Sequence, residues 1–580
     1  MSTVPRARSA TPSVPAAARV IHDGFVSYNR AFKRITDRAK RRFEQRDWQG
    51  QFRDIAERVE LYEDWANRAE RSMREHLGER VHDRDLWRSI RRNYGERIEG
   101  VPDAGFMKTF FNSITRRIFG TIGVDPQVEF VQPPPEEGVQ SLTMRRYPCW
   151  DDVQASCGRV LGDFRVKVRF ADRRADARFM AEEVRAYLAR EGVTPDQVRR
   201  FEFIDSHFFQ GTRAYLVGRV RHDSHVSPII VALKNAGDGV RVDAVLMQEE
   251  QISVVFSYTR SYYFADPTSV VAAVQFLHSI LPSKPIDELY TVLGRLRQGK
   301  TERYRVFMDH LKYTQDEFVH AAGDVGLVMI VFTLSSFNLV FKVMRDVFGA
   351  PKTTSHQDVE DKYRLVSRHD HAGRLIDTQH FRNLELPLHR FSRALLDDLL
   401  AEAPRTVRIE GDRVIFFKAY VERRVRPLNL YIREVDRAEA ERVILDYGQC
   451  IKDLAETNIF AGDLLLKNFG VTDSGRVVFY DYDEVALVTD CNFRELPEPD
   501  EDFMMADPGT TRFFGPNDIF PEEFIRFLSL EPPLRSAFLA VHGDLLDPDY
   551  WRDVKRRRQR GEIAEVVPYA RQTVPTALGG

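Results

Sequence analysis

The sequence predicts an α+β protein in which a mostly helical N-terminal domain precedes a second domain of β-hairpins and helices. Three observations support this prediction. Between residues 20 and 77, apolar and aromatic residues recur at three- and four-residue steps, which is typical of amphipathic helices. Between about 155 and 260, short β-type runs follow one another. After residue 312, turns separate apolar strands that carry single charged residues. At 580 residues the chain also exceeds what one hydrophobic core holds.

The N-terminal part can be assigned element by element. Residues 1–17 offer little to bury, so we expect a disordered leader. Helices over 20–77, 86–98 and 106–122 should form a bundle, because amphipathic faces cover one another. A strand is predicted over 164–170 and a helix over 174–191. Five strands are then expected, over 201–204, 213–220, 228–233, 240–247 and 252–258. Two helices follow, over 267–281 and 286–311. This N-terminal domain should therefore span 18–312.

Composition excludes several classes of protein. Lys plus Arg is 85 and Asp plus Glu is 87, so the chain has no general nucleic-acid footprint, and we expect no nucleic-acid partner. Its four cysteines form no C-x-x-C pair, which argues against zinc and disulfide scaffolds. The N-terminus lacks the apolar core of a signal peptide, and no run approaches about 18 apolar residues. We therefore expect a cytoplasmic protein that does not enter a membrane.

Residues 458–484, NIFAGDLLLKNFGVTDSGRVVFYDYDE, carry the clearest chemical signal. Asp463 and Asn468 have the spacing of the protein-kinase loop H-R-D-L-x-x-x-N, and an apolar run leads into Asp481, where a kinase has the Asp of D-F-G. An Asp and an Asn alone would favour an ordinary hairpin turn. The ordered set favours phosphoryl transfer, in which the protein positions groups and neutralises charge. Asp463 would accept the hydroxyl proton, and Asn468 with Asp481 would hold Mg²⁺ through oxygen ligands.

The segment upstream has the order of a nucleotide-binding lobe. Small residues at 321–326 precede an expected hairpin of two strands, 327–334 and 338–343, and small residues let backbone N–H groups approach phosphate. Lys342 on the second strand resembles the lysine of the kinase V-A-I-K strand, although for that residue alone an edge-strand lysine that blunts aggregation is an equally good interpretation. A helix over 356–366 offers Glu360 as its candidate partner.

Further elements complete a collinear kinase order. Strands are expected over 407–410 and 414–420, a lobe-joining segment over 421–428, and a long helix over 437–456. The sequence therefore predicts a protein-kinase-like bilobal catalytic domain over 313–565 with a flexible tail over 566–580. Several positions depart from the kinase pattern. Ala461-Gly462 replaces His-Arg, Lys467 follows the Asp by four residues, and D-Y-D-E replaces D-F-G.

With these departures, the chain resembles the isocitrate dehydrogenase kinase/phosphatase family. The matching stretches are AAGDVGL (321–327), NLVFKV (338–343), GRLIDTQ (373–379), VERRVRPLNLY (421–431), NIFAGDLLLKNFGV (458–471) and VVFYDYDE (477–484). The resemblance runs from about residue 20 to about residue 550.

The resemblance implies a bifunctional enzyme that uses ATP or ADP with Mg²⁺ and takes AMP as an allosteric effector. Its partner would be NADP-dependent isocitrate dehydrogenase, a homodimer whose active-site serine is phosphorylated and dephosphorylated, which switches carbon between the citric acid cycle and the glyoxylate bypass. Lys467 would be catalytic, Asp377 would serve the phosphatase reaction, and the segment 491–524 would dock the substrate. On local sequence alone Asp377 is a turn or helix-cap residue. The ATP-binding residues implied are Lys342 with Ala321, Ala322, Gly323, Asp324, Val325, Gly326 and Leu327.

Three other functions remain open at this point. A small-molecule kinase of the aminoglycoside or choline type carries a similar short D-x-x-x-x-N loop. A pseudokinase-like binding module is disfavoured because Lys342, Asp463, Asn468 and Asp481 are all present. Nucleic-acid binding by the Arg-rich helices of residues 20–100 is disfavoured by the charge balance and would show as salt-dependent DNA binding.

Overall fold

The computed structural model describes residues 13–131, 141–149, 152–223, 225–256, 263–350, 352, 354–369, 372–496, 515 and 517–569. Two compact units divide the chain. Of the described residues, the first unit holds 13–247 and 263–306, and the second holds 248–256 and 307–569. Both units combine helices with β-sheet, so the predicted α+β class is confirmed.

The first unit begins with the predicted helical bundle. Helices α1 (Val14–Gln45), α2 (Trp48–Leu77), α3 (Arg84–Arg97) and α4 (Ala104–Phe119) form it, and the first two are joined by a turn at Asp47, whose side chain accepts a hydrogen bond from the N–H of Gly50. The prediction of a disordered leader up to residue 17 is wrong for its last residues. Pro15 lies in the first turn of α1, where its missing N–H costs nothing, and Ala17 is fully buried. Residues 1–12 lie outside the described part.

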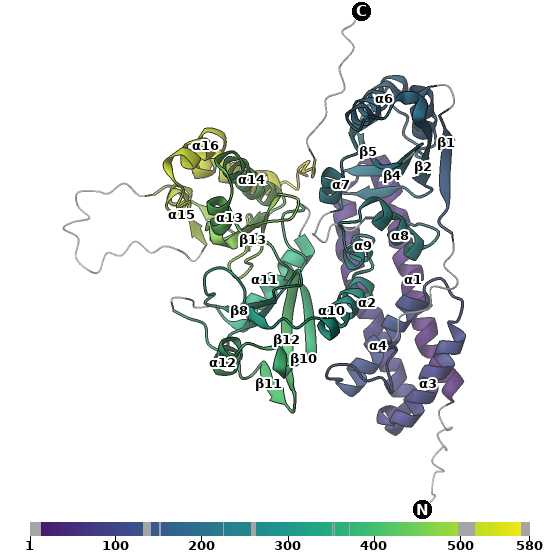
Figure 1. Ribbon diagram of the computed structural model, residues 1–580, viewed down its shortest axis with the longest axis vertical. Helices are drawn as coiled ribbons and strands as arrows, with labels where there is room; N and C mark the ends of the chain where they lie inside the picture. The colour runs from purple at the N-terminus through teal and green to yellow at the C-terminus, as the bar shows by residue number, and fades with distance from the viewer. Residues whose placement is uncertain are drawn as a thin grey trace, which may run out of the picture. The chain divides into compact units, whose positions relative to one another are not determined.

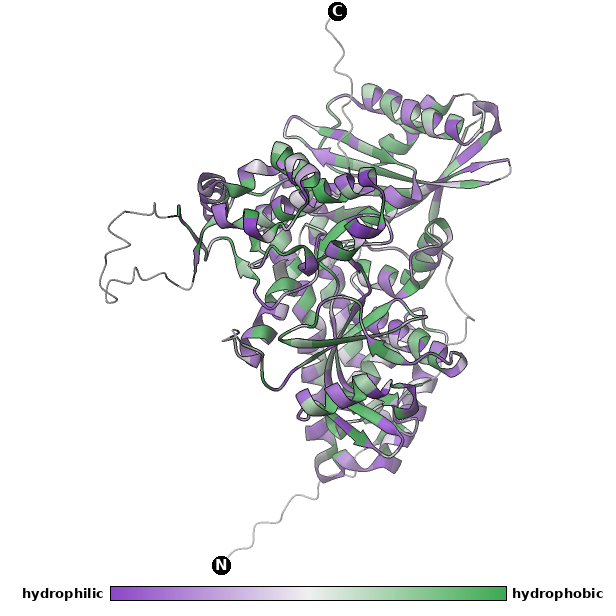
Figure 2. Ribbon diagram, turned by 60° about the vertical axis from the view of Figure 1, so that its left-hand side comes forward, coloured by the Kyte–Doolittle hydropathy of each residue, from purple (hydrophilic) through white to green (hydrophobic). Residues whose placement is uncertain are grey.

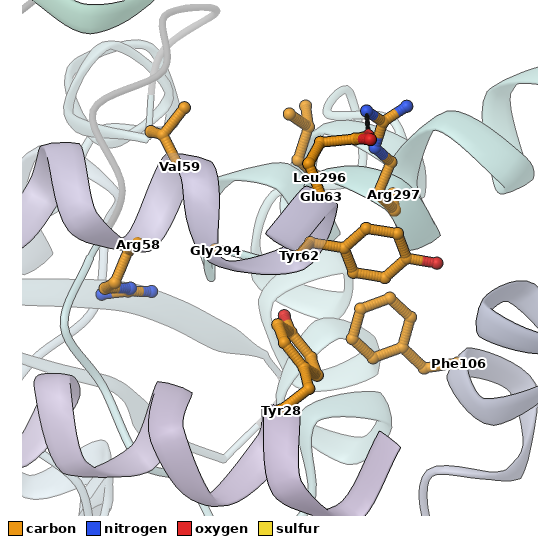
Figure 3. Close-up of a pocket in the computed structure, with 9 residues that line it drawn as sticks. All are labelled: Tyr28, Arg58, Val59, Tyr62, Glu63, Phe106, Gly294, Leu296 and Arg297. Carbon is orange, nitrogen blue, oxygen red and sulfur yellow. Dashed lines mark hydrogen bonds and ion pairs between the residues drawn. The ribbon is translucent and has the colours of Figure 1, made fainter. Parts of the chain in front are cut away.

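The bundle core is aromatic and closely packed, with one small cavity. The rings of Tyr28, Tyr62 and Phe106 face one another with centroids 5.5 to 5.8 Å apart (Figure 3). The cavity beside them is about 40 Å³, which has room for water but not for a metabolite. It is lined by Tyr28, Arg58, Val59, Tyr62, Glu63, Phe106, Gly294, Leu296 and Arg297.

An antiparallel sheet follows the bundle, as the run of short strands predicted. Its order is β1-β2-β4-β5-β6, with β3 paired to β4. The strands are β1 (Met144–Pro148), β2 (Val198–Ile204), β3 (Phe208–Gln210), β4 (Arg213–His222), β5 (Val226–Asn235) and β6 (Val240–Leu246). Helix α6 (Arg173–Arg190), next to α5 (Val153–Gly162), covers one face, and α8 (Val270–Ile280) covers part of the other (Figure 1).

Two predicted strands of this region are not strands. Over 164–170 only Phe170 forms a bridge, to Val240, because the neighbouring backbone bonds elsewhere; the N–H of Lys167 donates to the carboxylate of Glu44 at 2.9 Å. Residues 252–255 belong to helix α7 (Glu249–Val255), Phe256 is its C-cap, and 257–262 lie outside the described part. Two glutamates in the first turn of α7 favour a helix there.

The long helix predicted over 286–311 is two helices. Helix α9 (Ile286–Val292) ends before Gly294, whose φ of +79° no other residue adopts easily, and α10 (Leu296–Tyr313) begins after it. The boundary between the two units falls inside α10, at residues 306 and 307.

The second unit has two lobes. The smaller is a sheet of order β10-β12-β9-β8-β7, with β11 paired to β12. The predicted hairpin is present as β8 (Met329–Leu334) and β9 (Leu339–Met344). The other strands are β7 (Phe318–His320), β10 (Gln379–Pro387), β11 (Val407–Glu410) and β12 (Arg413–Arg423), and the helices are α11 (His356–His369) and α12 (Arg393–Glu402).

The larger lobe is helical around a small sheet of order β13-β15-β16 (Figure 1). Helix α14 (Arg437–Glu456) has the predicted bounds, and its N-cap Asp436 accepts a bond from the N–H of Glu439. The strands of the small sheet are β13 (Arg426–Pro427), β15 (Phe469–Val471) and β16 (Val477–Phe479). Two pairs of two-residue strands lie outside it: β14 (Ile459–Phe460) pairs with β17 (Ala486–Leu487), and β18 (Asn492–Phe493) pairs with β19 (Asp518–Ile519). The other helices are α13 (Leu428–Glu434), α15 (Phe524–Phe527), α16 (Pro532–His542) and α17 (Pro548–Gln559).

The tail packs further along the chain than predicted. Tyr569 is buried, and the carbonyl of Pro568 accepts a hydrogen bond from the Arg476 guanidinium at 3.1 Å, so flexibility from residue 566 onward is wrong for these residues. Residues 570–580 lie outside the described part. In Figure 2 the strands are mainly hydrophobic, whereas hydrophobic and hydrophilic residues alternate along the helices. Within the described ranges no helix is long and apolar enough to cross a membrane.

Candidate active site

Lys342 is buried between the strands of the smaller lobe. It is 4% exposed, and its Nζ lies 2.7 Å from Oε2 of Glu422, which is 1% exposed. The register explains the pair. Lys342 lies opposite Tyr420 on β12, so Glu422, two residues further on, points to the same face. Lys342 also donates to the carbonyl of Tyr480 at 2.8 Å. A buried, paired lysine contradicts the edge-strand interpretation.

The predicted partner of Lys342 is wrong. Glu360 on α11 forms its ion pair with Lys418, and both side chains are partly exposed. Lys418 lies on the same face of β12 as Glu422 but four residues earlier, so α11 meets the strand away from Lys342. Glu422 belongs to the stretch VERRVRPL, which is predicted from the sequence to join the two lobes. The sequence shows its charge but not the register of β12 against β9 that places it beside Lys342.

The three residues predicted for proton acceptance and metal binding come from one hairpin. Asn468 ends a 3₁₀ turn (Leu466–Asn468) directly before β15, and its Nδ2 donates to the backbone carbonyl of Asp463 at 3.3 Å. Asp481 follows β16, the strand that pairs with β15. The residue pair Phe469 and Phe479 brings the two ends of the hairpin together.

Burial is the main reason that these carboxylates resist ionisation. Burial and then the neighbouring Asp483 carboxylate raise the pKa of Asp481, against the lowering effect of Lys342. Burial and then the negative charge of Glu484 raise the pKa of Asp463. Buried carboxylates next to other carboxylates are stabilised by an added positive charge, so their oxygens and the Asn468 carboxamide fit a hard divalent cation. No group of three His, Cys, Asp or Glu ligands is found in the described part, and Mg²⁺ at kinase sites needs only one or two carboxylates besides phosphate and water.

The loop 321–327 joins β7 to β8 and lies against the larger lobe. Gly323 adopts a φ of +128°, and a Cβ there would lie 3.7 Å from the ring of Pro427 on β13. Asp324 lies 3.7 Å from the Nζ of Lys467 on the catalytic loop. The base of the loop is fixed by Arg345, which donates to the carbonyl of Gly326 at 3.1 Å. Gly326 itself has no room for a side chain, since a Cβ would lie 2.8 Å from the Met329 carbonyl. The predicted nucleotide loop therefore reaches the predicted catalytic loop.

The catalytic loop is shaped by a glycine and a buried tyrosine. Gly462, which stands where kinases have Arg, has a φ of +78°, and a Cβ there would lie 2.6 Å from the carbonyl of Glu484. Beneath the loop, the hydroxyl of Tyr447 on α14 donates to the carbonyl of Leu464 at 2.5 Å. These contacts hold Asp463 against the end of the D-Y-D-E stretch and give a reason for the departure from His-Arg.

Asp377 lies on a segment that crosses between the lobes. Leu375 forms a bridge with Phe479 of β16, and Gln379 begins β10 in the smaller-lobe sheet. Asp377 is 7% exposed, and its carboxylate accepts a bond from the side chain of Gln379 at 3.2 Å. Thr378 donates to Glu422 at 2.6 Å, which places this segment directly beside the Lys342 pair.

Two further residues of this region, both lysines, escaped the sequence reasoning. Lys352 lies 3.2 Å from Asp483 and also pairs with Glu484, and Lys362 on α11 donates to the carbonyl of Asp483 at 2.6 Å. The acidic run D-Y-D-E was the available signal, because two carboxylates beyond Asp481, the predicted metal ligand, need cations. Of the expected docking segment 491–524, residues 497–514 and 516 lie outside the described part; its ends form β18 and β19, which pair in parallel.

Comparison with known proteins agrees with this geometry. Residues 18–315 match the family model "Isocitrate dehydrogenase kinase/phosphatase (AceK), regulatory domain", and residues 316–571 match the corresponding kinase domain model. A protein of Anaeromyxobacter dehalogenans named isocitrate dehydrogenase kinase/phosphatase is 43% identical over 570 residues, covering 95% of this chain and 96% of its own. One of the same name from Xanthomonas campestris pv. campestris is 43% identical over 562 residues, with 96% of each chain covered. The chain belongs to the isocitrate dehydrogenase kinase/phosphatase family.

Proposed function

We propose that this protein phosphorylates a serine of NADP-dependent isocitrate dehydrogenase with ATP and also removes that phosphate, switching carbon between the citric acid cycle and the glyoxylate bypass. The observation that carries the proposal is the buried Lys342–Glu422 pair, which lies beside the segment of Asp377 and the strand end of Asp481. Family membership over nearly the whole chain supports isocitrate dehydrogenase over the small-molecule kinase alternative, since the relatives carry that name.

In the kinase direction, the serine oxygen attacks the γ-phosphorus of ATP, the bond from that phosphorus to the bridging oxygen breaks, and ADP leaves. Asp463 takes the serine proton; its raised pKa makes it a better proton acceptor than an exposed carboxylate. Lys342 is held by Glu422 at the position where a kinase lysine contacts phosphate. Lys467, beside Asp324 of the nucleotide loop, is placed to balance charge on the transferred group. Mg²⁺ bound by Asn468 and Asp481 would neutralise the phosphate oxygens.

In the phosphatase direction, water or a terminal oxygen of ADP attacks the phosphorus of the phosphoserine, the bond from that phosphorus to the serine oxygen breaks, the serine oxygen takes up a proton, and inorganic phosphate or ATP leaves. Asp377 orients the attacking oxygen. Its position on the crossing segment, next to the Lys342–Glu422 pair, supports a role at the same nucleotide site. We further propose AMP as an effector, a homodimeric substrate docked through the segment 491–524, and no nucleic-acid or membrane partner. Family membership supports the first two of these, and the charge balance supports the absence of a nucleic-acid partner.

The test is a two-way assay on purified NADP-dependent isocitrate dehydrogenase with the wild type and Asp377→Ala. One arm follows labelled phosphate from ATP onto the dehydrogenase, and the other follows its release from the phosphorylated dehydrogenase. We expect both activities in the wild type and loss of release alone in the variant. No transfer to the dehydrogenase by the wild type would refute the substrate assignment. Loss of both activities in a folded Asp377→Ala would refute the division of roles.

A further inference from the structure

Tyr482 stands where protein kinases have the Phe of D-F-G, and its hydroxyl makes contacts that no Phe can make. The side chain is fully buried. Its hydroxyl accepts a hydrogen bond from the N–H of Ile376 at 2.7 Å and donates to the carbonyl of the same residue at 2.8 Å. A hydroxyl can do both at once, because it carries one proton and two lone pairs. One side chain therefore binds both peptide groups of Ile376.

These contacts fall in the middle of the segment that crosses between the lobes. Before them, Leu375 bridges to Phe479 on β16; after them, Gln379 pairs with Val421 on β12. Between these two points the Tyr482 hydroxyl bonds to both backbone groups of Ile376, and it also lies 3.3 Å from the carbonyl of Phe479, the bridge partner of Leu375. The hydroxyl therefore fixes the chain at the point where it leaves one sheet for the other. Asp377, the next residue, takes its backbone position from this contact.

The two ends of the segment are held separately. On one side, the guanidinium of Arg374 donates to Asp446 and Asp453 of α14 at 2.7 to 2.9 Å. On the other, Thr378 donates to Glu422 at 2.6 Å. Both anchors remain if the hydroxyl is lost, so the segment stays attached while its centre is released. The predicted effect is therefore a displaced Asp377 rather than an unfolded segment.

We propose that Tyr482 is a positioning residue for dephosphorylation, whose hydroxyl fixes the peptide of Ile376 and thereby aims the carboxylate of Asp377 at the site. This inference rests on the proposed phosphatase function. Asp463 belongs to a different loop, held by Tyr447, and the strand before Asp481 is held by its pairing with β15 besides the 3.3 Å contact of its Phe479 carbonyl with the hydroxyl, so we expect phosphorylation to depend little on the Tyr482 hydroxyl. The ring of residue 482 packs on Tyr363 and Phe479, with centroids 5.2 and 5.8 Å away, and a Phe ring keeps that packing and with it the place of Asp481.

The experiment is Tyr482→Phe, which restores the kinase residue, measured in both directions on isocitrate dehydrogenase. We expect the phosphatase kcat to fall about 10- to 100-fold, as for a reacting group misplaced by about 1 Å, with KM for the phosphorylated dehydrogenase unchanged and kinase kcat within about threefold of wild type. The matched control is Tyr94→Phe. That hydroxyl is equally buried and donates to the carbonyl of Met107 at 3.1 Å in the other unit, so both activities should stay unchanged.

A double-mutant cycle separates positioning from general loosening. If Tyr482 acts through Asp377, adding Tyr482→Phe to Asp377→Asn lowers phosphatase activity no further than Asp377→Asn alone. Equal loss of both activities in Tyr482→Phe, or losses that multiply in the double variant, would overturn the proposal. An inactive wild type would instead refute the proposed function, and the same assays report that outcome separately.

Discussion

The Lys342–Glu422 pair gives the sharpest energetic prediction, through the variant Glu422→Gln. The substitution removes a charge but keeps the shape and the oxygen that accepts the Thr378 bond. It leaves the Lys342 ammonium, 4% exposed, with the Tyr480 carbonyl and the nearby Asp481 as remaining partners. Breaking a buried pair by removing one partner costs about 3–5 kcal/mol. Because these two partners remain, we expect the lower end, about 3 kcal/mol.

The matched control is Glu360→Gln, which breaks the pair with Lys418. Those side chains are 33% and 24% exposed, so the expected cost is about 0–1 kcal/mol. Because the chain has two units, one global free energy is not well defined. Hydrogen exchange of peptides from β9 and β12 reports the local opening free energy instead. A Glu422→Gln value within about 0.5 kcal/mol of wild type, or a larger loss in Glu360→Gln, would refute the assignment of the partner.

Two further predictions concern the catalytic loop and the regulatory unit. Gly462→Ala places a Cβ against the Glu484 carbonyl at a residue with positive φ, so the kinase kcat should fall at least about tenfold while KM for ATP stays nearly unchanged. A Gly462→Ala variant with the wild-type kcat would show that the loop does not need glycine. Burial raises the pKa of Asp176 to about 6, so the folded state favours the protonated carboxyl group. The contribution of this group to stability is therefore fully present below the ordinary pKa near 4 and is lost as pH rises through about 6. Asp176→Asn should therefore raise the local opening free energy of peptides from α6, measured by hydrogen exchange, at pH 8 but not at pH 4, and an equal effect at both pH values would contradict this.

The pattern of neighbouring residues was enough to predict helices and hairpins, because their hydrogen bonds join residues that are close in sequence. The bounds of α14 follow from its apolar period and its Asp436 cap, and the β8–β9 hairpin follows from two apolar runs around a polar turn. Asp463, Asn468 and Asp481 could be proposed together because they lie at the open end of one short hairpin, before β15 and after β16.

Contacts between distant segments were not predictable. Glu422 and Glu360 were both acidic candidates, and only the register of β9 against β12 decides between them. The run at 164–170 alternates as a strand does, but a strand needs a partner, and the carboxylate of Glu44, 123 residues away, takes one of its N–H groups instead. The role of Tyr482 likewise depends on a segment 106 residues earlier in the chain.

The account's central claim is that one nucleotide site serves both reactions, and Lys342→Met tests it most directly. The substitution keeps the length of the side chain and removes its charge, and it leaves Asp463 and Asp377 in place. Both the transfer of phosphate to isocitrate dehydrogenase and its release should fall by at least about 100-fold, since each needs the same phosphate contact. Release at the wild-type rate from a folded Lys342→Met protein would contradict the claim and require a second site.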